Sequence, residues 1–408
     1  MTLVTPDLTA TDIDVFSSEV YTTGIPHEQF AWLREQPGML LQQIPDPDLE
    51  SEAFIAARYA DLLAVSKDGE HFTITDGHNV RKVRGRSDGR NLLVLDDPDH
   101  LQLRMRANKG FTPRMVRKFE AHYRDLADRI LARALANDQF DFVTNVSAEL
   151  PLAAICELIG APPEDHGQIF GWSNAIIGTE DSEYSSGLEG RVQASAEMAA
   201  YSERLAVERL AHPRDDLLTS LAQDTARGEM TQDEFFLYIL LLFVAGNETT
   251  RNNISHGVFA LAQRPEDWRR LAATPVDDPL WDSAVEEVTR WATPVIYMSR
   301  TCTKSVDVNG QQVEPGQVVA MFYPSANRDE AIFGPSAAEF DITRQPNPHL
   351  SFGFSTHFCL GAHLARLETK VMLQQLLTQV GQLQILEAPS RLRSSFIHGM
   401  KHLMVTAE

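Results

Sequence analysis

A cysteine between an irregular loop and a helix is the residue of this sequence best suited to metal chemistry. The segment reads Phe352-Gly-Phe-Ser-Thr-His-Phe-Cys-Leu-Gly-Ala-His-Leu-Ala-Arg366, and a helical pattern begins almost directly after Cys359. Backbone N–H groups at a helix N-terminus stabilise negative charge and lower the pKa of a thiol. Gly361 leaves room for a flat ligand, and Phe352 and Phe358 could shield the sulfur from water. The arrangement indicates a thiolate that ligates a metal.

Three other interpretations of Cys359 stay open at this point. A lone cysteine is more often a small buried hydrophobe, which is our interpretation of Cys156 and Cys302. Cys359 and His363 lie four residues apart on one helix, so a zinc site is a second possibility, although no second pair of ligands is evident. A cysteine–histidine nucleophile is the third, and it would need a base and an oxyanion hole from elsewhere.

A second stretch that could do chemistry lies midway along a long expected helix. Thr231 and Glu234 form an S/T-x-x-E capping box, and a helical pattern follows with no proline until Pro265. At Ala245-Gly-Asn-Glu-Thr-Thr250 an apolar run gives way to six small or polar residues. Ser and Thr side chains compete for helical hydrogen bonds, and a buried Glu is costly unless it is paired. We therefore expect the helix to open locally beside a cavity.

The elements that must position these two stretches are mostly helices. Besides the long helix, the patterns predict helices at about 26–35, 115–137, 281–292 and 361–380, and two within 164–210. Short strands are expected at about 54–58, on both sides of the Asn309-Gly310 turn, and near Gly399 in a terminal hairpin. The polar stretch 179–187 is typical of a surface loop. No convincing linker divides the chain, so residues 1–408 are expected to form a single, mainly α domain with a small β part.

The cysteine segment resembles the haem-binding loop of the cytochrome P450 monooxygenases, F-x-x-G-x-x-x-C-x-G. Phe352, Cys359 and Gly361 match, and Ser355 stands where the family usually has Gly. Gly at that position eases a tight backbone turn, so we expect Ser355 to add some strain without loss of haem. The resemblance implies the cytochrome P450 fold. Haem b would then bind through the Cys359 sulfur, between the long central helix and the helix that follows the cysteine.

Two further motifs follow the order they have in that family. Ala245 to Thr250 resembles the family's oxygen-binding kink, which implies that Ala245 adjoins the haem and that Glu248 and Thr249 occupy the acid and alcohol positions. Glu287-Val-Thr-Arg290 resembles the family's E-x-x-R, although such an i,i+3 pair alone is usually a surface pair. Arg344 would complete a Glu-Arg-Arg cluster with a structural role, which is to hold the loop that carries Cys359.

A fourth motif concerns the haem propionates. His100 and Arg104 lie four residues apart on one helix face, and the family uses this pair on a propionate. Arg300 and His357 match the family's other two propionate-binding positions. Cationic or donor groups that converge on two carboxylates make physical sense, because buried carboxylates need partners.

The resemblance implies a reaction that inserts one oxygen atom of O2 into a substrate C–H bond and releases the other as water. Thiolate ligation favours O–O cleavage, and Glu248 with Thr249 would deliver the protons. No flavin or iron–sulfur motif is present, so electrons are expected from an iron–sulfur ferredoxin with its ferredoxin reductase and NAD(P)H.

A basic segment in an acidic chain is the expected place for that partner. Residues 81–118 contain 11 Lys or Arg and 4 Asp or Glu, while the whole chain has a net charge of −21. A solvated face or an access loop for substrate suits residues 81–90. The residues expected to dock ferredoxin are Arg104, Arg106, Lys109, Arg114 and Arg117.

The substrate is expected to be apolar. By analogy with the family, the pocket would be formed by Val94, Leu95, Leu241, Val244, Ala245, Val295, Ile296, Met298, Phe396 and Ile397. The segments 294–301 and 395–401 look similar to those of actinobacterial members that hydroxylate methyl-branched lipids and sterol side chains. Terpenoid or aromatic hydroxylation is the alternative within the family. A non-catalytic haem sensor is the alternative outside it, but a sensor needs no acid–alcohol pair.

Composition limits the remaining classes of protein. With 408 residues, 43% hydrophobic and 23% charged, the chain is neither disordered nor collagen-like. The net negative charge argues against a nucleic-acid partner. Three cysteines, no evident signal peptide and a longest apolar run of 11 residues (235–245) predict a cytoplasmic protein that does not span a membrane.

Overall fold

The computed structural model describes residues 8–46, 48–81 and 91–408, apart from the side chains of residues 107 and 109. Its α-helices are α1 (His27–Glu35), α2 (Tyr59–Lys67), α3 (Asp99–Asn108), α4 (Pro113–Arg117), α5 (Glu120–Ala134), α6 (Glu149–Ile159), α7 (His166–Ile177), α8 (Leu188–Ala211), α9 (Leu217–Ala226), α10 (Gln232–Ala262), α11 (Pro265–Ala272), α12 (Leu280–Ala292), α13 (Tyr323–Ala326), α14 (Glu330–Phe333) and α15 (Ala362–Gln379). Short 3-10 or π-helical turns lie at Ala10–Asp12, Val20–Thr22, Leu92–Val94, Lys109–Phe111, Val143–Ser147, Pro163–Asp165 and Ser355–His357.

The strands are short and fewer residues belong to them. They are β1 (Leu40–Gln43), β2 (Glu52–Ala56), β3 (Phe72–Thr73), β4 (Phe140–Asp141), β5 (Tyr297–Cys302), β6 (Val306–Val308), β7 (Gln311–Val313), β8 (Val318–Phe322), β9 (Leu383–Ile385), β10 (Ser390–Arg391), β11 (Met400–His402) and β12 (Met404–Ala407). The predicted fold class, mainly α with a small β part, is confirmed.

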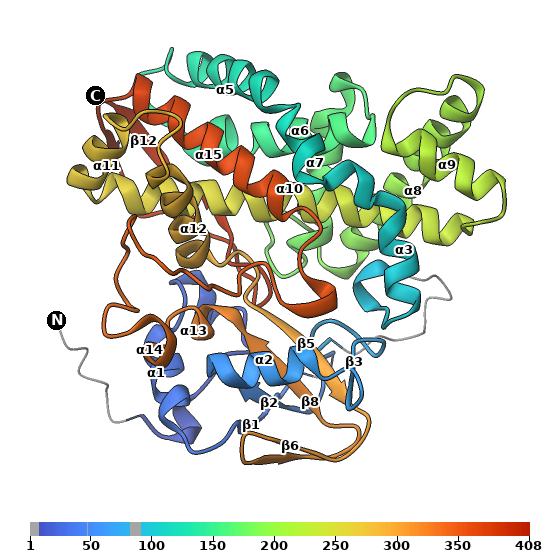
Figure 1. Ribbon diagram of the computed structural model, residues 1–408, viewed down its shortest axis with the longest axis vertical. Helices are drawn as coiled ribbons and strands as arrows, with labels where there is room; N and C mark the ends of the chain where they lie inside the picture. Colours follow the sequence, from blue (N-terminus) through green and yellow to red (C-terminus); the bar gives the residue numbers. More distant parts are fainter. Residues whose placement is uncertain (1–7, 47, 82–90) are drawn as a thin grey trace.

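The long helix α10 forms the centre of the helical part (Figure 1). It spans 31 residues and packs against α6, α7, α12 and α15. Most of its side chains beyond residue 246 are buried, polar ones included. The helix α15, which follows Cys359, packs on α5 as well as on α10. The two stretches that sequence analysis marked for chemistry are therefore carried by neighbouring helices.

The start of α10 is fixed by the predicted capping box, but the predicted opening of the helix is wrong. The Thr231 side chain accepts a hydrogen bond from the Glu234 N–H (3.1 Å), and the Glu234 carboxylate accepts one from the Thr231 N–H (2.8 Å). The helix runs unbroken through residues 245–250. The Thr249 hydroxyl donates to the carbonyl oxygen of Ala245 (2.8 Å), which is already helical, and so does not compete with the helix.

A five-stranded sheet of order β1-β2-β8-β5-β3 lies beside the helices, at the bottom of Figure 1. β2 and β8 pair in parallel and the other neighbours are antiparallel. On β5, Met298 pairs with Met321 and Arg300 with Val319. Alternate residues of a strand share a face, so Met298 and Arg300 point to the same side. This is how the sheet contributes to the site described below.

The local turn signals were predicted correctly, whereas several helices were not predicted. β6 and β7 form the hairpin expected around Asn309 (φ 50°) and Gly310 (φ 90°), and β10 pairs with β11 near Gly399. The single helix predicted at 115–137 is two helices, α4 and α5, joined through residues 118–119. The helices α2, α6, α9, α11, α13 and α14 were not predicted from the sequence, whereas α3 carries His100 and Arg104 on a helix as expected.

Within residues 8–46, 48–81 and 91–408, no helix combines the length and the apolar character needed to cross a lipid bilayer.

Candidate active site

A cavity of about 250 Å³ lies between α10 and the loop that carries Cys359. Cys359 and the first turns of α15 border it on one side, and Ala245 and Thr249 of α10 border it on the other. Met298 and Arg300 of β5 also line it. The two stretches predicted to do chemistry therefore face one shared space.

The backbone around Cys359 is arranged to present the sulfur to that space. The Cys359 N–H donates to the Phe352 carbonyl (2.8 Å), and the chain enters α15 within three residues. Burial raises the pKa of the Cys359 thiol, while the Gly361 N–H, Arg104 and Arg366 lower it. The predicted net lowering is thus wrong for the protein alone, because desolvation outweighs the helix N-terminus. Coordination to a metal would deprotonate such a thiol outright.

Ser355 adopts the strained conformation that the departure from the family motif predicts. Its φ is 61°, in the left-handed region where residues other than Gly are disfavoured. Gly353, two residues earlier, has φ 71°. The loop therefore needs two left-handed residues in close succession and has glycine at only one of them.

The substitution Ser355→Gly is expected to stabilise the protein by about 0.5–1 kcal/mol. It removes the left-handed strain of about 1–2 kcal/mol, and the greater freedom of Gly in the unfolded chain offsets part of the gain. The free energy of unfolding from urea titration measures the effect. Ser390→Gly, in strand β10 at a residue without positive φ, is the matched control and should lose stability. A variant at 355 that loses as much as the control would contradict the strain argument.

The α10 wall of the cavity combines small residues with hydroxyl groups. Gly246 borders the cavity, and a Cβ there would meet the Ile155 side chain at 2.9 Å, so glycine permits the close approach of α6. Thr249 borders the cavity and is half-buried. Thr250 and Asn253 extend the polar part of this wall.

Glu248 does not share the cavity wall with Thr249. Its side chain is fully buried and forms an ion pair with Arg251, one turn further along α10. Arg251 also donates to the Asn174 side chain (3.0 Å) and lies over the rings of Phe170 and Tyr184. Burial raises the pKa of Glu248, and Arg251 opposes that rise. Of the predicted acid–alcohol pair, the structure brings only the alcohol to the cavity.

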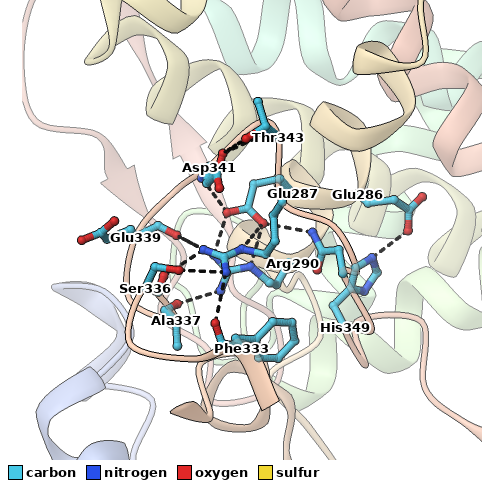
Figure 2. A network of polar contacts seen from close by, with 12 residues as sticks. Glu286, Glu287, Arg290, Phe333, Ser336, Ala337, Glu339, Asp341, Thr343 and His349 are labelled. Carbon is cyan, nitrogen blue, oxygen red and sulfur yellow. Dashed lines mark hydrogen bonds and ion pairs between the residues drawn. The ribbon is translucent and has the colours of Figure 1, made fainter. Parts of the chain in front are cut away.

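The predicted Glu-Arg-Arg cluster is assembled and buried (Figure 2). Glu287 and Arg290 side chains are both 0% exposed, and Arg290 Nε and Nη2 donate to the Glu287 carboxylate at 2.8 and 2.7 Å. Arg344 Nε donates to the same carboxylate at 3.2 Å. The Asp341 N–H and the Asn347 amide also donate to it, at 2.7 and 3.0 Å.

This cluster connects to the start of the cysteine loop. Arg290 Nη1 donates to the Asn327 carbonyl (2.8 Å), and the Asn327 side chain accepts from the Leu350 N–H (2.7 Å). Asn327 Nδ2 also lies 2.9 Å from Ser351 Oγ, to which it donates. Ser351 Oγ in turn donates to the Thr289 carbonyl (2.8 Å). The residue before Phe352 is thereby tied to α12 from two directions.

A second tie holds the loop from the side of α15. Arg366 lies over the Phe352 ring, 4.4 Å from its centroid, and donates to Glu286 at 2.5 and 3.0 Å. His349 also contacts Glu286, at 3.0 Å (Figure 2). Burial raises the pKa of Glu286, but hydrogen bonds from His349 and Arg366 prevail and lower it to about 2.

All four residues assigned to the propionates border the cavity. His100 is 1% exposed, and its ring lies 4.2 Å from that of His357. Arg104 Nη2 donates to the Phe358 carbonyl (2.7 Å). Arg300 is 8% exposed and donates to the carbonyl of its neighbour, Ser299.

These residues fit the haem that the resemblance implies. Among the described residues, no carboxylate forms an ion pair with Arg300, although its guanidinium is buried. Burial lowers the pKa of Arg300, and burial beside Arg300 and His100 lowers the pKa of His357 to about 3. Two porphyrin carboxylates would give the Arg300 guanidinium a counterion and would accept hydrogen bonds from the rings of His100 and His357. Cys359, at the same cavity, would ligate the haem iron.

Four of the residues predicted to form the apolar wall border the cavity. Leu241, Ala245, Val295 and Met298 border the cavity, and so does Phe352 of the cysteine loop. The remaining wall includes apolar residues that sequence analysis did not name, which are Ile74, Leu92, Leu93, Phe111, Ile155 and Leu242.

Six predicted wall residues do not reach the cavity. In the turn Leu92–Val94 the lining positions are Leu92 and Leu93, so the prediction of Val94 and Leu95 was two residues late. Val244 falls on a different side of α10 from Leu241 and Ala245, and Ile296 is fully buried beside β8. Phe396 and Ile397 do not border the cavity, although Ile397 lies beside Val295 in an isolated β-bridge.

Glu368 borders the cavity and was missed by sequence analysis. It is 1% exposed, and one of its carboxylate oxygens has no hydrogen-bond partner. Burial raises its pKa well above the usual value, which favours the protonated form. Gly361, Leu364, Ala365 and Glu368 recur at the i, i+3, i+4, i+7 spacing of one helix face, which is the signal that could have revealed it.

The alternatives for the cysteines find no support. His363 is exposed and does not border the cavity with Cys359. In the described part of the chain, no three His, Cys, Asp or Glu residues are grouped to hold a metal ion. Cys156 and Cys302 are buried, as interpreted from the sequence.

Comparison with known proteins agrees with this geometry. A family profile described as Cytochrome P450 matches residues 276–380. The methyl-branched lipid omega-hydroxylase of Mycobacterium tuberculosis is 43% identical over 321 residues, covering 78% of this chain and 74% of that protein. The steroid C26-monooxygenase of Mycolicibacterium smegmatis is 35% identical over 413 residues, covering 98% and 95%.

Solved structures extend the likeness to the fold. Mycobacterium marinum cytochrome P450 CYP268A2, in complex with pseudoionone, superposes with a TM-score of 0.89 and 31% identity. The match covers 97% of this chain and 98% of that one. Sequence and architecture thus agree over nearly the whole length, and the chain belongs to the cytochrome P450 family of monooxygenases, whose cofactor is haem b.

Proposed function

We propose that this protein hydroxylates the branched hydrocarbon end of an apolar lipid, either a methyl-branched fatty acid or a sterol side chain. The observation that carries this proposal is the cavity bordered by the Cys359 sulfur and Thr249, whose wall also includes many leucine, isoleucine, valine, methionine and phenylalanine side chains. These apolar side chains favour a substrate that buries apolar area. The names of the two mycobacterial relatives agree with this class of substrate.

The residues of the cavity have three proposed roles: to ligate the haem iron, to contact the haem propionates, and to position substrate and protons. Haem, when bound, supplies a thiolate-ligated iron at which O2 is reduced and cleaved. Cys359 would be its axial ligand, and the propionates would be held by His100, Arg104, Arg300 and His357. The third group positions substrate and protons, and Thr249 is the hydroxyl of α10 nearest to that task.

Optical spectroscopy of the purified protein tests the proposal. The reduced, CO-treated protein should show the red-shifted Soret band of thiolate-ligated haem. Titration with methyl-branched fatty acids, sterols and terpenes should then give a spin-state change with the first two classes, followed by hydroxylated product. A binding response confined to terpenes or to aromatic compounds would overturn the substrate assignment.

The substitution Thr249→Ala is expected to divert electrons from product to hydrogen peroxide while haem content stays normal. The Thr249 hydroxyl is positioned on the cavity wall to hold a proton, and a positioned donor contributes roughly 10²–10⁴ in rate. Product formed per NADH should fall at least about tenfold. Thr249→Ser, which keeps the hydroxyl, should restore most of the coupling. Unchanged coupling in the alanine variant would contradict the role of Thr249.

The acid that supplies Thr249 has two candidates, one on α10 and one on α15. Glu248 is adjacent in sequence but paired with Arg251 away from the cavity. Glu368 of α15 borders the cavity, and burial raises its pKa. We assign the relay to Glu248 through water, as the family motif implies, and Glu248→Gln and Glu368→Gln compared for coupling separate the two.

We further propose that the electrons come from a ferredoxin that docks on α4. Of the five basic residues predicted to form the docking face, Arg104 is turned to the cavity loop, and Arg106 is paired with Asp224 (2.8 Å). The side chain of Lys109 lies outside the described part. Arg114 and Arg117 remain exposed on α4, which packs against α15 behind Cys359.

Neutralising these two arginines is expected to weaken ferredoxin-dependent turnover. Arg114→Gln/Arg117→Gln should raise the KM for ferredoxin about three- to tenfold and flatten its rise with added salt, because exposed charges act over about 10 Å at 0.1 M salt. Steady-state kinetics at several salt concentrations measure both effects. Arg269→Gln, exposed on α11, is the control and should change neither. An equal salt response in the double variant would argue against docking at α4.

A second substrate class keeps a specific observation in its favour. The solved cytochrome P450 of Mycobacterium marinum has pseudoionone bound, and the cavity here has apolar side chains that a terpenoid could also contact.

We also propose that residues 1–408 act as one domain. A cytoplasmic location is proposed because the three cysteines are all free thiols.

A further inference from the structure

A tight turn at residues 394–399, between β10 and β11, lies beside residues 294–296, and Pro294 and Val295 border the cavity. Val295 and Ile397 form an isolated antiparallel bridge, and the Ile296 N–H donates to the Phe396 carbonyl at 2.9 Å. Val295 borders the cavity, whereas Ile397 is only 2% exposed and does not. The position of this turn therefore determines where the wall at Val295 stands.

His398 fastens the turn to three other parts of the fold. Its Nδ1 donates to the Ala292 carbonyl at the end of α12 (2.7 Å), and its backbone N–H donates to the Pro294 carbonyl (2.9 Å). Its carbonyl accepts from His256 Nε2 on α10 (3.1 Å), and the two imidazole rings stack with centroids 3.9 Å apart. Arg391 Nη1 donates to His398 Nε2 at 3.3 Å. Both ring nitrogens are thus used, one as donor and one as acceptor.

The turn itself is closed by its own hydrogen bonds. Ser394 Oγ accepts from the Ile397 N–H (3.1 Å), and the Gly399 N–H donates to the Ile397 carbonyl (2.9 Å). His398 is 8% exposed and His256 5%, so solvent does not compete for their contacts. The turn is therefore a preformed unit. Backbone hydrogen bonds join it to residues 294–296, and the imidazole of His398 joins it to the end of α12 and stacks on His256 of α10.

We propose that His398 is a positioning residue for substrate selection, which holds the turn at 394–399 against residues 294–298 and so fixes the width of the cavity at Val295. This inference rests on the proposed function, because it takes the cavity to be the substrate site. Removing the imidazole leaves its buried volume empty next to the turn. The turn can then shift into that volume and take the bridged Val295 away from the cavity. A slender branched chain loses contacts with a receding wall, whereas a broad fused-ring steroid gains room.

Ligand selectivity is the readout that a merely structural residue would not change. The test compares the dissociation constants of phytanic acid and cholestenone, each obtained by optical titration of the haem-loaded wild type and of His398→Ala. The ratio of the two constants should shift about tenfold toward the steroid, the size of effect that small changes of pocket volume produce. His398→Asn, whose Nδ2 can still donate to the Ala292 carbonyl, should recover most of the wild-type ratio. An unchanged ratio in the alanine variant overturns the proposal.

Two further measurements separate this inference from general destabilisation and from the proposed function. Val308→Ala, a buried truncation in the β6–β7 hairpin, should lower stability without moving the ratio, and an equal shift there would count against His398. Hydrogen exchange reports on the link without any ligand. Exchange of the Ile296 amide should speed up at least tenfold in His398→Ala and return in His398→Asn. Unchanged exchange overturns the link even if both lipids bind, whereas failure of both lipids to bind the wild type overturns only the proposed substrate class.

Discussion

Replacing Glu287 with glutamine is expected to lower the free energy of unfolding by about 3–5 kcal/mol, the usual cost of removing one partner from a buried ion pair. Glu287 is 0% exposed, and its carboxylate accepts hydrogen bonds from both Arg290 and Arg344. Glutamine has nearly the same shape but no charge, so two guanidinium groups would remain buried without a counterion. Its amide group would also point a donor at the Asp341 N–H or at the Asn347 amide.

Urea or guanidinium unfolding monitored by circular dichroism measures this loss. The matched control is Asp282→Asn, which removes a carboxylate from the same helix, α12. Asp282 is 74% exposed and pairs with Lys370, so its loss should change stability by no more than about 1 kcal/mol. Haem content per folded protein should fall in the Glu287 variant only, because Arg290 connects through Asn327 to the cysteine loop. A loss of stability no larger than that of the control would show that the cluster is not a structural centre.

The same cluster shows what spacing along a sequence cannot decide. Two charges at i and i+3 on a helix are as compatible with a solvated face as with a buried pair. What places Glu287 and Arg290 inside is the segment 327–347, whose carbonyl groups surround the arginine. Those contacts join residues 37 to 49 positions apart in an irregular segment, and no periodic pattern signals them. Only the resemblance to a family pointed to the cluster.

Features set by local chemistry were predictable. The capping box at Thr231 and Glu234, the left-handed Asn309-Gly310 turn and the strain at Ser355 each depend on a few consecutive residues. The loop at Cys359 is of the same kind, since its turn and the following helix are encoded within about fifteen residues. These elements were placed correctly because their stabilising interactions are short in sequence.

Features set by distant partners were not predictable. The acidic stretch 179–187 was interpreted as a solvated surface loop, yet Asp181 is 5% exposed and accepts hydrogen bonds from the Arg393 N–H and from Lys401. Arg81 pairs with Glu180 in the same stretch, while residues 82–90 lie outside the described ranges. Arg106 likewise meets Asp224, more than a hundred residues away. The composition of a loop indicates that it lies near the surface, but it does not indicate which distant residues its side chains contact.

The cavity wall shows the same limit at the scale of single residues. Sequence reasoning placed most of the apolar wall in the correct segments but misjudged which side chains turn inward. A shift of one residue along an extended chain, or of about 100° around a helix, moves a side chain from the cavity into the core. Val295 lines the cavity, for example, while the adjacent Ile296 is buried. The buried Glu368 was missed because an acid in an apolar stripe contradicts the usual pattern of burial.

Replacing Cys359 with alanine is expected to abolish oxygenase turnover and the red-shifted Soret band of the reduced, CO-treated protein. The Cys359 sulfur is the only thiol on the cavity wall, since Cys156 and Cys302 are buried elsewhere among the described residues. Even outer-shell partners of metal ligands contribute about 10–100-fold to activity, so loss of the ligand itself should cost more than about a hundredfold. Product formation and the optical spectrum, each normalised to folded protein, measure the effect.

The two other cysteines provide controls that distinguish ligation from general loss of a thiol. Cys302→Ala and Cys156→Ala should keep the thiolate spectrum, because neither sulfur borders the cavity and burial raises the pKa of both thiols. Haem could still enter the Cys359→Ala variant, since Arg300, His100 and His357 remain to meet the propionates. Such a protein would be coloured but would lack the red-shifted band, because a histidine or water cannot replace the electron donation of a thiolate. Retention of that band without Cys359, or its loss with Cys302→Ala, would assign the ligand to another sulfur and overturn the arrangement of the site.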